Sequence, residues 1–229
     1  MIKLFITATD TDAGKTYVAQ ALITALIEKK LTVAVYKPIS AGCEKVATAQ
    51  GTQLVNEDAL LLANAANCQQ SLVNVNPIAF EEPIAPHIAA DIHGKAIDLA
   101  FLEQHYQGIT ANQCDVVITE GAGGWRLPLG NGQFLSQLVQ NTQQDVILVV
   151  NLKLGCLNHA ILTYQSIVSD GLTCVGWVAN CLDNMPYLDE NIAELEQFFP
   201  MPLLATLDKQ SDITKAAAKF NVEPLLAHR

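Results

Sequence analysis

The sequence has little charge, few aromatic residues and no concentration of basic side chains. Only 16% of the 229 residues are charged and 6% are aromatic, whereas half are hydrophobic, so the chain can bury a large core and is neither disordered nor a coiled coil. Thirteen Lys and Arg residues stand against 23 Asp and Glu residues, a net charge of −10. Because such a surface repels nucleic acid and anionic lipid, we expect neither as a partner.

Long apolar runs and paired cysteines are also missing. No run approaches the ~18 residues of a transmembrane helix, and the apolar stretch at residues 4–6 lacks the core and cleavage site of a signal peptide. We therefore expect a cytoplasmic protein. The six cysteines form no C-x-x-C pair. In a reducing compartment they are expected to be buried thiols rather than a zinc or redox site.

Short runs rich in β-branched residues predict buried strands of a parallel sheet at residues 2–7, 32–36, 116–119, 146–150, 175–178 and 203–207. Helical spacing of apolar residues lies between them, as at Ala19, Leu22, Ile23 and Leu26, and at Leu99, Leu102 and Tyr106 behind a predicted N-cap, Asp98. This alternation predicts a doubly wound α/β fold with helices on both faces of a mostly parallel sheet. The length fits one domain, residues 1–229. Residues 40–53 and 76–86 are predicted to be long functional loops.

The strongest motif lies at residues 6–16, where a predicted strand enters a loop of small residues that ends in Gly14-Lys15-Thr16 and opens a helix. Backbone N–H groups at such a helix start bind phosphate, Lys15 adds a positive charge, and the Thr16 hydroxyl can bind Mg²⁺. The strict pattern requires Gly at position 9, which is Thr9. The prediction of a P-loop therefore rests on the strand before the loop and the helix after it. The alternative is an ordinary turn between a strand and a helix.

A second set of charged residues is predicted at the same sheet edge. Glu120 closes a strand before the glycine-rich turn of residues 121–124, where a carboxylate can hold Mg²⁺ or simply cap a helix. Lys37 closes the second strand and can neutralise an anionic substrate, or snorkel as a surface lysine. Asp58 begins a helix, where the helix dipole alone would favour an acid. Its role as a metal ligand stays open on these grounds.

Together these motifs resemble the ATP-dependent dethiobiotin synthetase family. The resemblance runs over residues 5–204 and includes the loop at 9–16, the segments 36–38, 58–59 and 86–87, the turn at 120–125, and the segments 153–160 and 176–180. It implies a P-loop NTPase fold and a cytoplasmic homodimer. It also implies an enzyme that uses ATP and Mg²⁺ to form dethiobiotin from 7,8-diaminopelargonate and CO₂, a step of biotin biosynthesis.

The resemblance also assigns roles to residues. Lys37 and Lys15 are the implied catalytic residues, and Asn180 is placed at the adenine, although it could be only a turn residue. The implied nucleotide-binding residues are Asp12, Ala13, Gly14, Lys15, Thr16, Glu120, Gly121, Gly123 and Asn180. The implied metal ligands are Thr16, Asp58 and Glu120, and the implied substrate contacts are Ser40, Ala41, Lys153 and Asn158.

Some positions depart from the family pattern. Ala8 replaces a loop glycine, which costs little if its φ is negative. Asp12 replaces a longer Glu, so we expect a weaker or water-mediated contact. Ala41 and Ala85 stand where hydroxyls are usual, and Ser40, one position earlier, is expected to point away because neighbouring side chains in extended chain face opposite sides. These exchanges bear on the substrate more than on the reaction type.

Three other functions fit the motifs less well. One is another synthetase of the same superfamily that acts on a different amine or carboxylate, and a second is a kinase. The third is a nucleotide switch of the partitioning-ATPase kind, which usually has a second lysine early in the loop, whereas positions 9–13 here are Thr, Asp, Thr, Asp and Ala. The segment 213–220 also has too little apolar surface for a membrane helix.

Overall fold

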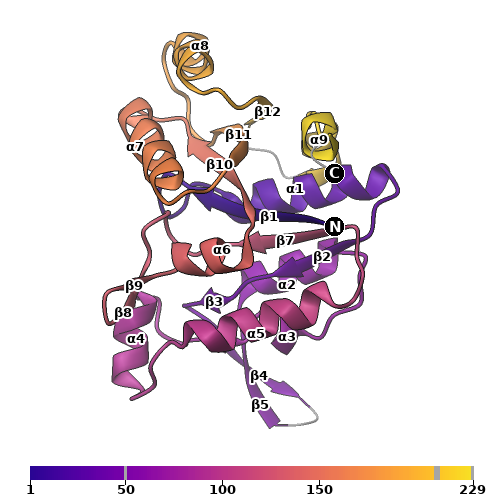
Figure 1. Cartoon of the computed structure of the whole chain (residues 1–229), viewed down its shortest axis with the longest axis vertical. Coiled ribbons are helices and arrows are strands. Elements are labelled where there is room, and N and C mark those ends of the chain that lie inside the picture. Colours follow the sequence, from indigo (N-terminus) through magenta and orange to yellow (C-terminus); the bar gives the residue numbers. More distant parts are fainter. Residues whose placement is uncertain (49–50, 209–211, 228–229) are drawn as a thin grey trace.

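The computed structural model describes residues 1–48, 51–208 and 212–227, and within them one six-stranded parallel sheet forms the centre (Figure 1). The strands lie in the order β12-β11-β10-β1-β7-β2. All six strands predicted from the sequence are confirmed, each within a few residues: β1 (Ile2–Ala8), β2 (Val33–Tyr36), β7 (Val116–Glu120), β10 (Asp145–Asn151), β11 (Cys174–Cys181) and β12 (Leu203–Asp208). Because β1 lies between β10 and β7, a crevice is expected where their carboxyl ends diverge.

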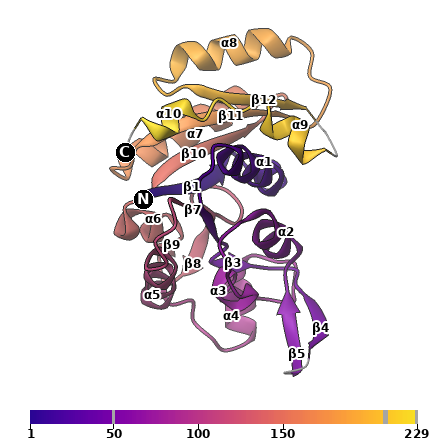
Figure 2. The same ribbon diagram turned by 90° about the vertical axis from the view of Figure 1, so that its right-hand side faces the viewer.

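Helices cover both faces of this sheet, which confirms the doubly wound fold (Figure 2). One core layer involves α1 (Lys15–Glu28), α2 (Glu57–Ala65), α3 (Leu72–Val75), α9 (Ile213–Ala217) and α10 (Glu223–Leu226). The other involves α4 (Pro86–Ile92), α5 (Leu99–Thr110), α6 (Ser136–Thr142), α7 (Cys156–Ser169) and α8 (Leu188–Phe198). The predicted apolar stripes of α1 and α5 are buried, and Asp98 Oδ1 accepts a hydrogen bond of 2.9 Å from the Ala100 N–H as the N-cap. No helix in the described ranges is long and apolar enough to cross a membrane.

The prediction of a long loop was wrong for most of the described part of residues 40–53, whereas most of residues 76–86 is a loop, as predicted. The first region contains the hairpin β4 (Glu44–Thr48) and β5 (Gly51–Val55), with residues 49–50 outside the described part. The second contains β6 (Ile78–Ala79), which pairs with β3 (Ile39–Ser40), and it reaches the start of α4. A further hairpin joins β8 (Pro128–Gly130) to β9 (Gln133–Phe134). The described part of the β4–β5 hairpin is mostly exposed, so no apolar run marks it in the sequence.

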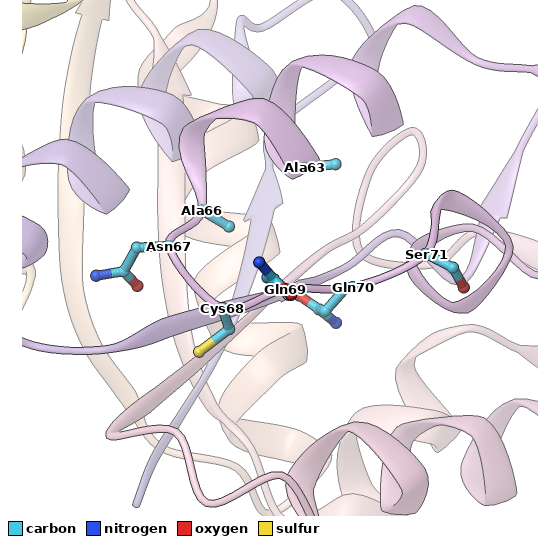
Figure 3. A pocket seen from close by; sticks show the side chains of 7 residues that line it. All are labelled: Ala63, Ala66, Asn67, Cys68, Gln69, Gln70 and Ser71. Carbon is cyan, nitrogen blue, oxygen red and sulfur yellow. The ribbon is translucent and has the colours of Figure 1, made fainter.

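The open edge of β2 is covered by residues 67–70, which follow α2 (Figure 3). The Asn67 side-chain oxygen accepts from the Val33 N–H at 2.7 Å, and the Cys68 N–H donates to the Val33 carbonyl at 3.2 Å. The Gln70 amide makes two bonds to Val35, accepting from its N–H at 2.8 Å and donating to its carbonyl at 3.0 Å. These side chains satisfy the edge of the sheet where another strand would otherwise pair. The same segment lines a shallow hollow of about 510 Å³.

The prediction of six free thiols was wrong for two of them, because Cys68 and Cys114 form a disulfide. These residues are separated by 46 positions in the chain but lie beside the neighbouring strands β2 and β7, a proximity that only the fold creates. Burial raises the pKa of Cys174 to about 12. The other cysteines are buried free thiols, as predicted: Cys43, Cys156, Cys174 and Cys181.

Candidate active site

The predicted phosphate-binding loop joins β1 to α1. Gly14, the residue before α1, has a φ of +79°, and a Cβ at this position would lie 2.3 Å from the Asn180 side-chain nitrogen. Only glycine therefore fits there. Ala8, the last residue of β1, is not among the residues of positive φ, so its replacement of a glycine brings no backbone strain. The loop leads directly into the N-terminus of α1, where backbone N–H groups can bind an anion.

A cavity of about 900 Å³ lies at the carboxyl ends of β1, β2 and β7. It brings together five of the predicted site residues: Lys15, Thr16, Lys37, Asp58 and Glu120. Lys37 and Glu120 come from the ends of β2 and β7, and the other three come from the first turns of α1 and α2, so the sheet edge gathers residues far apart in the sequence. Asp12, Gly14, Ser40, Ala41, Ala85 and Gly123 also line the cavity.

Buried charges dominate one wall of the cavity. The Lys37 ammonium donates to Glu120 Oε1, and it also lies 3.5 Å from Asp58 Oδ2 and 3.4 Å from the Gly121 carbonyl. Lys37 is 3% exposed and Glu120 is 1% exposed. Burial alone would lower the pKa of Lys37, but the carboxylates of Glu120 and Asp58 outweigh it and hold this pKa above its ordinary value.

Lys15 faces the same cavity with a weaker set of partners. Its ammonium donates to the Asp10 carbonyl at 3.4 Å, and the residue is 8% exposed. Burial, followed by the nearby charge of Lys37, lowers the pKa of Lys15 to about 8. Lys15 adds a second positive charge to the cavity, and its ammonium contacts a backbone carbonyl rather than a carboxylate. This side of the cavity can therefore attract phosphate oxygens.

The residues predicted to hold Mg²⁺ fit that ion chemically. The Thr16 hydroxyl donates to Glu120 Oε1 at 3.0 Å, and Asp58 reaches the same place from α2. The second oxygen of Glu120, Oε2, is buried and has no hydrogen-bond partner among the described residues. Hydroxyl and carboxylate oxygens are the ligands Mg²⁺ prefers. In the described ranges no group of three His, Cys, Asp or Glu residues could hold a metal alone, so phosphate or water oxygens would complete the shell.

The sequence reasoning missed Asn76. Its buried amide donates to the Lys37 carbonyl at 2.7 Å, and its oxygen accepts from the Ser40 hydroxyl at 2.7 Å. Asn76 thereby joins the end of β2 to β3, and the only signal for it was its place in a segment predicted to be functional. The Ser40 hydroxyl is turned into the protein, as expected, and Ala41 and Ala85 leave this wall of the cavity without a hydroxyl group.

Five predicted residues do not line the cavity in the described part of the chain: Ala13, Gly121, Lys153, Asn158 and Asn180. Asn180 is fully buried, and its amide donates to the Ala13 carbonyl at 2.8 Å, so it supports the phosphate loop from below. Lys153 lies outside and pairs with Asp10 at 3.4 Å. Asn158 is exposed on α7. The sequence pattern had no means of showing that Asn180 lies under the loop.

The glycine-rich turn after β7 is held from behind by aromatic packing. A Cβ on Gly121 would lie 2.8 Å from the ring of Phe5, and this ring packs edge-on against Trp125 with centroids 6.0 Å apart. The Trp125 indole N–H donates to Asp170 at 2.8 Å. These contacts place the backbone of the turn beside the cavity, where Gly123 lines it.

Solved structures of other proteins share the fold of this chain. The chain is similar to the signal recognition particle receptor FtsY from Elizabethkingia anophelis, with a TM-score of 0.54 and 15% identity, covering 99% of this chain and 64% of that chain. It is also similar to the MinC:MinD cell division protein complex from Aquifex aeolicus, with a TM-score of 0.56 and 13% identity, covering 100% and 88%. Identities this low show the fold alone, that of a P-loop NTPase.

Sequence relatives are much closer. Residues 3–217 match a family model described as an AAA domain. Three curated relatives, all called ATP-dependent dethiobiotin synthetase BioD, come from Alteromonas mediterranea (42% identical, covering 98% of this chain and 100% of that protein), Cellvibrio japonicus (44%, 97% and 96%) and Aeromonas salmonicida (44%, 99% and 100%). Similarity of this extent, together with a cavity that gathers the predicted residues, means that the chain belongs to the ATP-dependent dethiobiotin synthetase family.

Proposed function

We propose that this protein is an ATP- and Mg²⁺-dependent ligase that converts 7,8-diaminopelargonate and CO₂ to dethiobiotin, with release of ADP and phosphate. One observation carries the proposal: two buried lysines, a hydroxyl and two carboxylates converge on one cavity beside a phosphate-binding loop. Relatives that match nearly the whole chain bear the corresponding name. The kinase and partitioning-switch hypotheses lack such support.

The residues suggest a division of labour. One substrate amine adds to CO₂ to form a carbamate, and Lys37 lies where it can stabilise this anion. A carbamate oxygen attacks the γ-phosphorus of ATP and ADP leaves, while Lys15 offsets charge on the transferred group. The second amine then attacks the carbonyl carbon of the resulting anhydride, and phosphate departs with the C–O bond electrons. No protein nucleophile is required.

Binding of ATP and Mg²⁺ is assigned to groups around the loop. Thr16, Asp58 and Glu120 would hold the metal, which supplies positive charge beside the phosphates. Asn180 would offer its oxygen to the adenine amine, since Oδ1 has no hydrogen-bond partner within the described ranges. The remaining proposed nucleotide contacts are Asp12, Ala13, Gly14, Lys15, Thr16, Glu120, Gly121 and Gly123.

The assembly is proposed to be a cytoplasmic homodimer of single-domain subunits, residues 1–229. Lys153 and Asn158 lie outside the cavity, which fits a role at the substrate of a neighbouring subunit rather than their own. Leu154, between them, is 96% exposed, an apolar side chain that a second copy would cover. Within one subunit, Ser40 and Ala41 would contact the substrate through backbone and apolar surface.

Product analysis tests the function. We expect ADP release that requires both bicarbonate and diaminopelargonate, and a product whose mass corresponds to dethiobiotin. A kinase would leave phosphate on the substrate, and another synthetase would release ADP with a different amine or carboxylate. ADP release independent of bicarbonate would contradict the proposed reaction.

A further inference from the structure

The Lys37 ammonium lies among the oxygen atoms that the proposed function assigns to the metal. It donates to Glu120 Oε1, which also accepts from the Thr16 hydroxyl at 3.0 Å, and it lies 3.5 Å from Asp58 Oδ2. All three proposed metal ligands are therefore linked to one positive charge, directly or through Glu120. The ammonium therefore occupies the position among these oxygen atoms where the metal ion would bind.

We propose that Lys37 and the divalent cation compete for Glu120 and Asp58, so that arrival of the metal moves the Lys37 ammonium off these carboxylates and towards the carbamate. The inference rests on the metal site of the proposed function and adds a second role for Lys37. Before the metal binds, the lysine neutralises a buried carboxylate. After the metal binds, the same lysine is available to the substrate anion.

Electrostatics opposes simultaneous occupation of this place by both cations. Two like charges in direct contact repel strongly in a partly buried site, because the effective dielectric there is far below that of water. Glu120 Oε2 has no partner among the described residues, so the metal can engage this oxygen first. The Thr16 hydroxyl can keep donating its proton to Glu120 Oε1 while its oxygen lone pairs stay available to a metal, so this hydrogen bond does not have to change.

The displaced ammonium has room to remain in the cavity. It lies 3.4 Å from the Gly121 carbonyl, and Lys37 itself lines the cavity together with Ala41 and Ala85. Asn76 donates to the Lys37 carbonyl and so holds the backbone of the lysine. This contact does not involve the ammonium and is unaffected when the ammonium moves. Movement of the side chain alone is therefore sufficient.

Binding of Mn²⁺ alone, without nucleotide, tests the competition. We expect Lys37→Gln to bind Mn²⁺ at least about tenfold more tightly than the parent protein in an electron paramagnetic resonance titration, because the competing charge is gone. The matched control is Lys153→Gln, which removes a positive charge that pairs with Asp10 of the phosphate loop rather than with the metal ligands. It should change Mn²⁺ affinity less than about twofold.

A further variant separates failure of the inference from failure of the metal assignment. Glu120→Gln should abolish the tight Mn²⁺ binding of Lys37→Gln when the two changes are combined. If Mn²⁺ binding depends on Glu120 but has the same affinity with Lys37 or Gln at position 37, the competition is overturned and the metal site stands. If Glu120→Gln leaves the affinity for Mn²⁺ unchanged, the metal assignment and the inference both fail.

A structure of the parent protein with Mn²⁺ and a non-hydrolysable ATP analogue gives a test that needs no variant to fold. The anomalous signal of manganese would locate the ion, and we expect the Lys37 ammonium to have left Glu120 Oε1. A metal bound by Glu120 with Lys37 still donating to the same oxygen would overturn the proposal.

Discussion

At the scale of single residues, the two lysines of the cavity differ in what they support. Lys37 neutralises a buried carboxylate, whereas the Lys15 ammonium makes one long contact to a backbone carbonyl. A substitution of Lys15 therefore leaves no buried charge unpaired. We therefore expect substitution of Lys15 to affect catalysis alone, and substitution of Lys37 to affect both catalysis and folding stability.

Lys15→Ala should reduce turnover by roughly 10³-fold or more, because a positive charge on the transferring phosphoryl group is worth several kcal/mol in a site shielded from water. Thermal unfolding should stay close to that of the parent. Steady-state ADP release and a melting curve measure the two effects. Parent-like turnover would contradict the phosphate-loop assignment.

Lys37→Gln should also abolish most turnover, but with little change in the apparent affinity for ATP, since Lys37 is proposed to meet the carbamate. It should in addition lower the free energy of unfolding by about 3 kcal/mol, because Glu120 is left buried without its partner. Combining it with Glu120→Gln should recover much of the stability and none of the turnover. Labelled CO₂ trapped on the bound diamine measures carbamate formation. If the Lys37→Gln variant traps as much label as the parent protein and turns over as fast, Lys37 has only a structural role.

At the scale of elements, the edge of β2 depends on side chains rather than on a further strand. Gln70 closes both backbone groups of Val35, and Asn67 closes the N–H of Val33. Because Lys37 directly follows the last residue of β2, this cover also supports the position of the lysine in the site.

Gln70→Ala should lower the free energy of unfolding by about 1–3 kcal/mol, because two backbone groups at the sheet edge lose their partners. The neighbouring Gln69 is exposed, and Gln69→Ala should stay within about 0.5 kcal/mol of the parent. Urea denaturation of the two variants makes the comparison. Equal losses would mean that Gln70 does not close the edge.

At the scale of the whole molecule, the Cys68–Cys114 disulfide joins the segment after α2 to the start of β7. The four free cysteines are buried, and burial raises the pKa of Cys156, Cys174 and Cys181 above the ordinary value of a thiol. The folded protein should therefore react slowly with thiol reagents. Only unfolding or reduction should expose reactive sulfur.

Reduction should lower the free energy of unfolding by up to about 4 kcal/mol, the chain-entropy value for a cross-link of this span. Unfolding without reductant should release four reactive thiols and unfolding with reductant six, counted with a chromogenic disulfide. The control is Cys68→Ala, whose unfolding should not respond to reductant. Six thiols without reductant would show that the bridge does not form.

The sequence by itself determined the sheet, the helical faces and the group of residues at the sheet edge. Local information suffices for these, because β-branched runs, helical spacing and a Gly-Lys-Thr loop each act over a few residues. Parallel strands then bring their carboxyl ends to one edge. Lys37 and Glu120 were predicted to meet the loop there, and they do.

Only the tertiary structure decided the contacts between segments distant in the chain. The hairpin of β4 and β5, the disulfide, the Asn76 link and the support of the loop by Asn180 all depend on partners that no local pattern identifies. The contact of the Lys37 ammonium with Glu120 belongs to the same class. Two residues 83 positions apart were each predicted to serve a ligand, and burial in one low-dielectric cavity makes them serve each other.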